Sequence, residues 1–263
     1  MIENTLNKII EKKRIRINEL KNSVSLNDLI ENIKNQKNFL NFKEKINKNI
    51  IDDKYSLIAE IKKASPSAGI IIKDYNPVSI ANLYNNNKAT CLSVLTEEDF
   101  FLGNLLHITK IKEKVNLPIL CKDFFIDPFQ VQLAKSYGAD AILIIISALD
   151  DGMADKIYEE ALKENMSIIV EVHTKEEATK ALRFKDAIIG INNRNLKTLK
   201  TNINTTFDLY KVIEKHAGPI VSESGIQSKE DILKISKKTR IKTFLIGESI
   251  LKKLDNNSIF SIL

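Results

Sequence analysis

Charged side chains interrupt an apolar run in the segment SLIAEIKKASPS, residues 56–67. Glu60 and Lys62 are two positions apart, so their side chains lie on the same face of a β-strand. Charges on the inner face of a buried strand are costly unless they are paired or used chemically. In a partly desolvated cavity a lysine can act as a general acid and a glutamate as a base. On its own this spacing marks a candidate site, and lysines gathered beside carboxylates in such a cavity would suit carbonyl activation and proton transfer.

Polar residues also follow most of the later apolar runs, at the carboxyl ends of the expected strands. They are Thr96, Glu97, Lys122, Glu171, Asn192, Arg194, Glu223, Ser224 and Gly247. One such residue alone usually reaches solvent, but polar groups at the same end of six strands favour a shared site. Two lysines, several carboxylates and an amide would converge there.

The three histidines do not predict a metal site. His107, His173 and His216 are scattered and lack the spacing of metal ligands. His173 would share a face with Glu171 if that strand continued. We expect the strand to end before it, which favours a structural role for His173.

Two glycine-containing loops predict a phosphate site. The segments SESGI (222–226) and LIGES (245–249) each place a glycine after a strand and at the start of a helix. Backbone N–H groups and the helix dipole attract anions there, and the last two loops of a barrel often bind phosphate. We expect Glu248 to face outward, because its charge would repel an anion. Ser65 is a candidate contact for a ligand oxyanion, although Ser-Pro-Ser also suits a simple turn.

The elements that must position these residues alternate regularly from residue 55 onward. The strand-like runs are 56–61, 89–95, 117–121, 139–146, 166–172, 187–191, 218–222 and 242–246. Helix-like stretches lie at 77–87, 103–115, 127–137, 150–164, 174–184, 204–216, 227–237 and 247–254. Eight such units with nearly continuous apolar strands predict an α/β fold, a (β/α)8 TIM barrel. A doubly wound open sheet is the alternative, but no GxGxxG follows the first strand.

Residues 1–48 are predicted to form a helical extension. Apolar residues at helical spacing mark its first helix: Leu6, Ile9, Ile10, Ile17 and Leu20. A second helix is expected after Ser25. No linker divides the rest of the chain, so residues 1–263 are expected to form a single barrel domain.

The net charge of +6 is concentrated near the N-terminus, where residues 1–50 hold eleven Lys or Arg against six Asp or Glu. Such a cluster can mark a nucleic-acid partner. These charges, however, are spaced along amphipathic helices and lack interleaved aromatic residues. A solvated helical face is the favoured interpretation.

The cysteines and the apolar segments indicate the compartment. Cys91 and Cys121 lie in apolar runs without pairing or metal spacing, as expected of core residues in a reducing cytoplasm. The N-terminus lacks the apolar core of a signal peptide, and the segment AILIIISAL at 141–149 is too short to span a membrane. We expect a soluble, cytoplasmic protein.

Seven ordered motifs resemble the indole-3-glycerol phosphate synthase family: IAEIKKASPS, SVLTEEDFFLG, ILCKDF, IVEVH, IGINNRNL, VSESGI and FLIGES. The match covers essentially the whole chain, including the helical extension, which in that family packs over the barrel mouth. The resemblance implies a lyase of tryptophan biosynthesis that converts 1-(2-carboxyphenylamino)-1-deoxyribulose 5-phosphate to indole-3-glycerol phosphate. It releases CO₂ and water and implies no metal or organic cofactor.

The resemblance also implies catalytic roles. Lys122 would be the general acid at the keto oxygen of the substrate. Lys62 would hold the anthranilate carboxylate and is a candidate acid in the dehydration. Glu171 and Glu60 would carry out the remaining proton transfers. The division of acid and base duties between the two Lys–Glu sets stays open.

Positioning and binding residues follow from the same resemblance. Asn192 and Glu223 would position the ring and the hydroxyl groups. The residues where the family binds substrate and phosphate correspond to Arg194, Ser224, Gly225, Gly247, Glu248 and Ser249, with Ser65 as the further candidate. This chain has Ala68-Gly69 where Lys-Gly is common in the family, which removes one potential contact from that loop.

Two other functions compete with this one. A related phosphosugar barrel enzyme, such as phosphoribosylanthranilate isomerase, would need one acid and one base but no second lysine for a carboxylate. A non-catalytic basic barrel that binds nucleic acid is disfavoured by the intact Glu60, Lys62, Lys122 and Glu171. The expected partner is a small phosphorylated substrate, with no nucleic acid and no membrane. We expect a monomer, with a dimer as the alternative.

Overall fold

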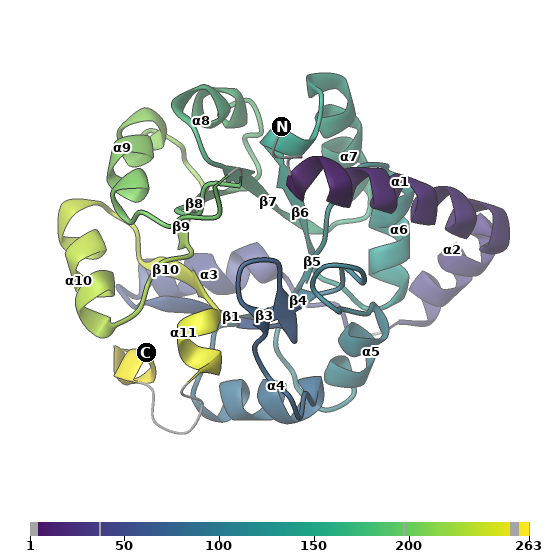
Figure 1. Cartoon of the computed structure of the whole chain (residues 1–263), viewed down its shortest axis with the longest axis horizontal. Helices are drawn as coiled ribbons and strands as arrows, with labels where there is room; N and C mark the ends of the chain where they lie inside the picture. The colour runs from purple at the N-terminus through teal and green to yellow at the C-terminus, as the bar shows by residue number, and fades with distance from the viewer. Residues whose placement is uncertain (1–4, 37, 197, 253–257, 263) are drawn as a thin grey trace.

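Eight parallel strands close into a barrel in the computed structural model, which describes residues 5–36, 38–196, 198–252 and 258–262 (Figure 1). The strands are β1 (Ser56–Ile61), β4 (Cys91–Leu95), β5 (Ile119–Lys122), β6 (Ala141–Ile145), β7 (Ser167–Val172), β8 (Ile188–Asn192), β9 (Ile220–Glu223) and β10 (Thr243–Ile246). β1 pairs with both β4 and β10, which closes the ring. The prediction of a (β/α)8 barrel is confirmed.

The register of the strands brings the predicted polar residues to one rim. Lys122 pairs with Leu95 at the end of β4, and Glu171 pairs with Ile145 at the end of β6. Asn192 pairs with Glu223 at the ends of β8 and β9. Because all strands are parallel, these residues share the carboxyl end of the barrel.

Helices surround the barrel. They are α4 (Pro77–Asn86), α5 (Leu106–Lys112), α6 (Phe129–Ser136), α7 (Asp151–Lys163), α8 (Lys175–Ala181), α9 (Asn204–Ile213), α10 (Lys229–Lys238) and α11 (Glu248–Leu251), with 3-10 turns η1 (Ile146–Ala148) and η2 (Ser258–Ile262). Of these, α4, α7, α8 and α10 begin at residues whose side chains cap them. Asn76, Asp150 and Thr174 each accept a hydrogen bond from an N–H in the first turn, and Ser228 forms a capping box with Asp231.

Several helices are shorter than predicted. The stretch 103–115 becomes α5, Leu106–Lys112. Gly103 precedes it in a loop, and its N–H donates to the carbonyl of Glu97 at 2.7 Å. A Cβ at this glycine would collide with the backbone of Leu95 and Thr96, so the loop folds tightly onto the end of β4. The predicted stretch 247–254 is helical over Glu248–Leu251, and residues 253 and 254 lie outside the described part.

Two apolar layers form the core. The larger lies between the strands and the surrounding helices, and the smaller fills the barrel. Cys91 is in the inner layer and Cys121 in the outer one, both buried and without a disulfide. Burial raises the pKa of both thiols, so they are core residues, as predicted.

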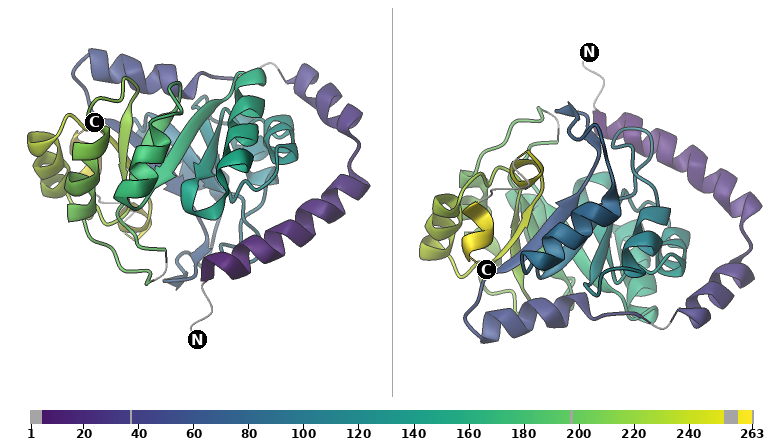
Figure 2. Two further views of the ribbon diagram at one scale, coloured as in Figure 1. Left: turned by 90° about the horizontal axis from the view of Figure 1, so that it is seen from above. Right: turned by 90° about the horizontal axis from the view of Figure 1, so that it is seen from below.

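The N-terminal extension is divided between the two ends of the barrel. It comprises α1 (Thr5–Ser23), α2 (Leu26–Asn35) and α3 (Phe42–Ile51), and Figure 2 shows α1 and α3 on opposite sides of the sheet. Phe42 and Ile46 of α3 are fully buried beneath the inner core, and the N–H of Lys43 donates to Ser167 at the start of β7. The expectation that residues 1–48 all pack at the mouth is therefore wrong for α3, whose apolar face covers the amino-terminal end instead.

A short hairpin follows β1 at the mouth. Strands β2 (Ala64–Ser65) and β3 (Gly69–Ile70) pair antiparallel around the Ser-Pro-Ser turn. Gly69 has a φ of 64°, a conformation that glycine adopts readily. Across the described ranges, we found no helix with the length and apolarity needed to cross a membrane.

Candidate active site

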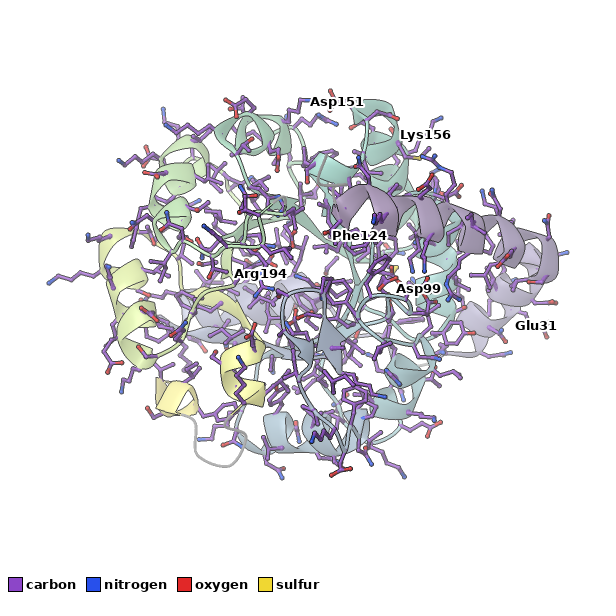
Figure 3. The ribbon with its side chains drawn as sticks, viewed as in Figure 1. Glu31, Asp99, Phe124, Asp151, Lys156 and Arg194 are labelled. Atoms are coloured by element: carbon purple, nitrogen blue, oxygen red, sulfur yellow. The ribbon has the colours of Figure 1, made fainter. Side chains whose placement is uncertain are left out.

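A cavity of about 670 Å³ opens at the carboxyl end of the barrel. Its polar lining includes Glu60, Lys62, Lys122, Glu171, Asn192, Arg194, Ser224, Gly225, Gly247, Glu248 and Ser249. Figure 3 looks into this end of the barrel, with Phe124 and Arg194 near the centre of the view. The sequence prediction that polar strand ends converge on one mouth is confirmed for these residues.

Lys122 lies between two buried glutamates. Its Nζ is 2.7 Å from Oε2 of Glu223 and 3.3 Å from Oε2 of Glu171. Burial works against the charged ammonium, but Glu223, Glu171 and Glu60 together raise the pKa of Lys122 above its usual range. Glu223 does not line the cavity, but its carboxylate contacts Lys122, which does. Glu223 would therefore affect a ligand through this lysine.

The two glutamates lie in different electrostatic surroundings. Burial raises the pKa of Glu223 to about 7, with Lys122 acting in the opposite direction and Glu171 adding to the rise. Glu171 experiences the same burial, yet Lys122, His173 and Asn192 lower its pKa below the usual range. Oε1 of Glu223 is buried without a hydrogen-bond partner. Oε1 of Glu171 lies within ion-pair distance of Nε2 of His173, at 3.2 Å, although this contact lacks the geometry of a hydrogen bond. These surroundings favour the protonated form at Glu223 and the ionised form at Glu171.

Lys62 and Glu60 form a second buried ion pair on β1 and just after it. Burial would raise the pKa of Glu60, but Lys62 and Lys122 lower it on balance. Gly247 at the end of β10 makes this arrangement possible, because a Cβ there would collide with the Glu60 carboxylate. The two Lys–Glu sets predicted from sequence thus share one cavity.

The loops after β9 and β10 lie beside each other, as predicted. Ser224 and Gly225 have φ values of 64° and 73°, a sharp turn that costs a non-glycine residue about 1–2 kcal/mol. The hydroxyl of Ser249 donates to the carbonyl of Ile226 at 2.8 Å, which joins the two loops. Such left-handed backbone at a non-glycine residue is typical of ligand-binding loops.

Two details of this region differ from prediction. Glu248 does not face outward: its carboxylate lines the cavity and accepts from Arg194 at 3.2 Å and from Lys252 at 2.6 Å. Ser65 does not line the cavity, because its Oγ accepts from the N–H of Ala68 within the turn. Ser67 lines the cavity instead, and Arg194 donates to its hydroxyl at 2.5 Å.

Two strand-end residues hold loops at the mouth and do not line the cavity: Glu97 holds the loop after β4, and Thr96 contacts the loop after β5. The carboxylate of Glu97 accepts from the N–H groups of Asp99, Phe100 and Phe101, and Thr96 donates to Asp123. Burial raises the pKa of Glu97, although these hydrogen bonds oppose the rise. Both side chains are buried loop anchors.

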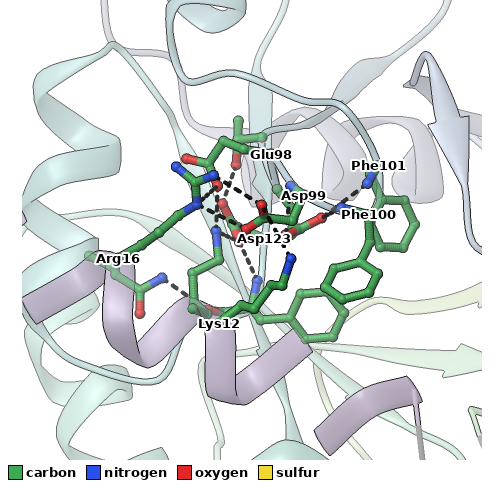
Figure 4. A network of polar contacts seen from close by, with 12 residues as sticks. Lys12, Arg16, Glu98, Asp99, Phe100, Phe101 and Asp123 are labelled. Carbon is green, nitrogen blue, oxygen red and sulfur yellow. Dashed lines mark hydrogen bonds and ion pairs between the residues drawn. The ribbon is translucent and has the colours of Figure 1, made fainter. Parts of the chain in front are cut away.

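Ion pairs attach α1 to this loop (Figure 4). Nζ of Lys13, which is 3% exposed, lies 2.8 Å from Asp123 and 2.9 Å from Glu98. Arg16 donates to both carboxylate oxygens of Asp99 at 3.0 and 3.1 Å. These contacts hold α1 where its first turns reach the cavity.

Apolar lining residues were missed by the sequence interpretation. Leu6 and Ile9 of α1, Phe101 of the loop after β4, and Phe124 all line the cavity. Phe124 follows Lys122 by two positions, the same alternation that relates Lys62 to Glu60, so it was detectable. The contributions of α1 and Phe101 depend on contacts distant in sequence.

His173 occupies a place that the sequence interpretation did not expect. β7 ends at Val172, as predicted, yet the His173 ring still lies against Glu171. Within the described part of the chain, no group of three or more His, Cys, Asp or Glu side chains is arranged to hold a metal ion. The metal-free chemistry stays a prediction.

The chain is similar to known proteins along nearly its whole length. The profile of the family described as indole-3-glycerol phosphate synthase matches residues 6–262. A protein of that name from Zymomonas mobilis subsp. pomaceae is 39% identical over 254 residues, covering 97% of this chain and 96% of its own length. One from Prochlorococcus marinus is 41% identical over 268 residues, covering 98% of this chain and 88% of its own.

Solved structures confirm the fold at low sequence identity. A tryptophan synthase alpha chain from Legionella pneumophila has a TM-score of 0.60 at 12% identity, covering 81% of this chain and 87% of its own. A 3-hexulose-6-phosphate synthase has a TM-score of 0.59 at 16% identity, covering 79% and 95%. The profile match and the full-length relatives go further than the fold: the chain belongs to the indole-3-glycerol phosphate synthase family.

Proposed function

We propose that the protein forms indole-3-glycerol phosphate from 1-(2-carboxyphenylamino)-1-deoxyribulose 5-phosphate, with release of CO₂ and water. The observation that carries the proposal is the pair of Lys–Glu sets at one mouth, beside two phosphate-type loops. In this proposal Lys122 protonates the keto oxygen of the substrate, and Lys62 binds its carboxylate. An isomerase would need only one of these sets.

Ring closure begins at Lys122, which donates a proton to the keto oxygen. The ring carbon that carries the carboxylate bonds to the keto carbon, and the bond to CO₂ then breaks, returning its electron pair to the ring. Lys62, compact and flexible, holds the carboxylate before it leaves. The buried Glu60 beside it keeps this cation in place.

Dehydration completes the reaction. The new hydroxyl leaves as water after it receives a proton, and a base removes a proton from the adjacent carbon to form the indole double bond. Glu171 suits the base because it lines the cavity and its pKa is lowered, which keeps it ionised at neutral pH. Asn192, next to Glu171, positions the substrate.

The phosphate is proposed to bind at the loops after β9 and β10. Ser224, Gly225, Gly247 and Ser249 line that side of the cavity. Arg194 and Lys252 are now held by Glu248, and a phosphate would compete with that carboxylate for both cations. Phosphate binding is therefore proposed to free Glu248.

The decisive test is a fluorescence assay for indole product on purified protein with the carboxyphenylamino substrate and no added metal. We expect product and CO₂ in equal amounts. No indole signal at high enzyme concentration contradicts the proposal, and turnover of phosphoribosylanthranilate alone would support the isomerase.

A set of variants tests the proposed roles of Lys122 and Lys62. Lys122→Arg keeps the charge between the glutamates, but an arginine does not release its proton, so kcat should fall about 10²–10⁴-fold. Lys62→Ala should lose activity, whereas the neighbouring Lys63→Ala should not, because Lys63 does not line the cavity. Substantial activity in Lys122→Arg would place the acid elsewhere.

The partner and the compartment are proposed on the same basis. The partner is a small phosphorylated substrate, and salt-sensitive binding of DNA or RNA at physiological ionic strength would contradict this. The two reduced, buried cysteines suit the cytoplasm. We propose a monomer, which size-exclusion chromatography with light scattering will test.

A further inference from the structure

The imidazole of His173 lies between two carboxylates, those of Glu171, which lines the cavity, and Glu177, which does not. Nε2 of His173 lies 3.2 Å from Oε1 of Glu171, and Nδ1 lies 3.1 Å from Oε2 of Glu177 on α8. The His173 side chain is 8% exposed and does not line the cavity. It therefore contacts the proposed base from the side opposite to a substrate.

Glu177 holds both the ring and the backbone of His173. The same Oε2 that contacts Nδ1 accepts from the N–H of His173 at 2.8 Å. The backbone N–H of Glu177 is itself bonded to the N-cap Thr174, so the carboxylate projects from a capped helix start. This rigid support fixes the orientation of the ring.

The charged groups that face His173 are both anionic. They are Glu171 on β7 and Glu177 on α8, while Lys122 of β5 lies on the far side of Glu171. Burial alone would lower the pKa of His173, but the two carboxylates raise it to about 9. The two carboxylates therefore favour the imidazolium form of the ring.

Glu223 has no such neighbour. Both glutamates contact Lys122, but Oε1 of Glu223 is buried without a hydrogen-bond partner. Beside Lys122, which contacts both carboxylates, His173 is therefore a second basic neighbour of Glu171. Environments that differ in this way separate a base from a protonated partner.

We propose that His173, held by Glu177, is a positioning residue whose contact with Glu171 orients this carboxylate and favours its ionised form as the base. The proposal rests on the proposed function for the role of Glu171 as base. The charge and orientation of His173 do not depend on that function.

The first experiment measures the charge of His173 directly. The chain has three histidines, so their imidazole signals can be assigned in an NMR titration of the whole protein. His173 should titrate near pH 9 in the wild type. Glu177→Gln should lower that pKa by about 1 unit or more, because it removes an opposite charge in contact with the ring. The control, Glu176→Gln on the exposed side of the same helix turn, should leave it unchanged.

The second experiment uses the pH dependence of kcat. In the wild type, kcat should fall at low pH as Glu171 becomes protonated. In His173→Gln this fall should begin about 1–3 pH units higher, because the loss of a contacting cation raises the pKa of Glu171. The plateau of kcat should fall about tenfold through lost orientation, while KM changes by less than about threefold. Glu177→Gln should shift this fall in the same direction by a smaller amount, and Glu176→Gln should match the wild type.

The outcomes are distinct. The proposal is overturned if kcat of His173→Gln and Glu177→Gln falls at the same low pH as that of the wild type. It is also overturned if His173 of the wild type titrates below pH 7. If His173→Gln fails to fold, Glu177→Gln decides. If wild-type protein yields no indole product, the proposed function fails, and the NMR titration alone then judges the imidazolium.

Discussion

Lys13→Met should weaken the attachment of α1 to the barrel. Lys13 carries a charge inside the protein, balanced by Asp123 at 2.8 Å and Glu98 at 2.9 Å. Burial alone would lower its pKa, but these two carboxylates raise it above the usual range. Methionine retains most of the aliphatic stem and removes only the charge, so the loss reports the ion pairs.

The expected cost is about 3 kcal/mol in the free energy of unfolding. Removing one partner of a buried ion pair costs about 3–5 kcal/mol, because the remaining charge stays buried and uncompensated. The lower end applies here. Glu98 is 28% exposed and can hydrate, and Asp123 keeps its hydrogen bonds from Thr96 and the N–H of Phe124.

The neighbouring Lys12→Met is the matched control. Lys12 is 58% exposed and lies 3.8 Å from Asp99 and 5.5 Å from the ring of Phe100. Such surface contacts contribute about 1 kcal/mol or less. Urea unfolding of both variants gives the two free energies, and KM for the substrate reports whether α1 still presents Leu6 and Ile9 to the cavity.

A double mutant distinguishes the ion pair from simple packing. Adding Asp123→Asn to Lys13→Met should restore about 1–2 kcal/mol, because it removes the uncompensated charge. The reasoning is refuted if Lys13→Met costs no more than Lys12→Met, or if the double mutant is fully additive.

Two other predictions follow from single contacts. Gly247→Ala should lower kcat/KM about 10²-fold, because the new Cβ would collide with the Glu60 carboxylate. Gly152→Ala on α7 is the control: its Cβ would lie 3.5 Å from Oδ1 of Asp150, an ordinary contact, so kcat/KM should not change. Glu223 has its pKa raised to about 7 in the folded state, so the stability from its bound proton is complete below the unfolded value of 4.5 and is lost as pH rises through 7. Melting temperatures measured from pH 5 to 8 should therefore fall less steeply for Glu223→Gln than for the wild type as pH rises. Plots of melting temperature against pH that run parallel for the two proteins would contradict this.

Most of the fold could be predicted from local pattern. Eight apolar runs separated by amphipathic stretches indicated a parallel barrel, because a strand buried on both faces must be nearly all apolar. The position of α3 could not be predicted in this way. Its amphipathic face matches either end of a barrel, and only the packing of Phe42 and Ile46 against the inner core determines which end it covers.

Most of the candidate site was also predictable, because parallel strands carry their terminal residues to one rim. The errors concern side-chain direction. Glu248 turns into the cavity because Arg194 and Lys252 attract it, and these cations come from two other parts of the chain. Glu97 turns away because three N–H groups of its own loop bind it.

Local sequence pattern was enough to predict the barrel, its strand ends and the lysines and glutamates at the mouth. Alternation and periodicity are properties of neighbouring residues, so they can be read without long-range contacts. Which charged groups touch depends on contacts between residues far apart in the chain. Glu171 and Glu223 both follow apolar runs, but His173 lies 3.2 Å from Glu171 and the two carboxylates have different neighbours once the chain is folded.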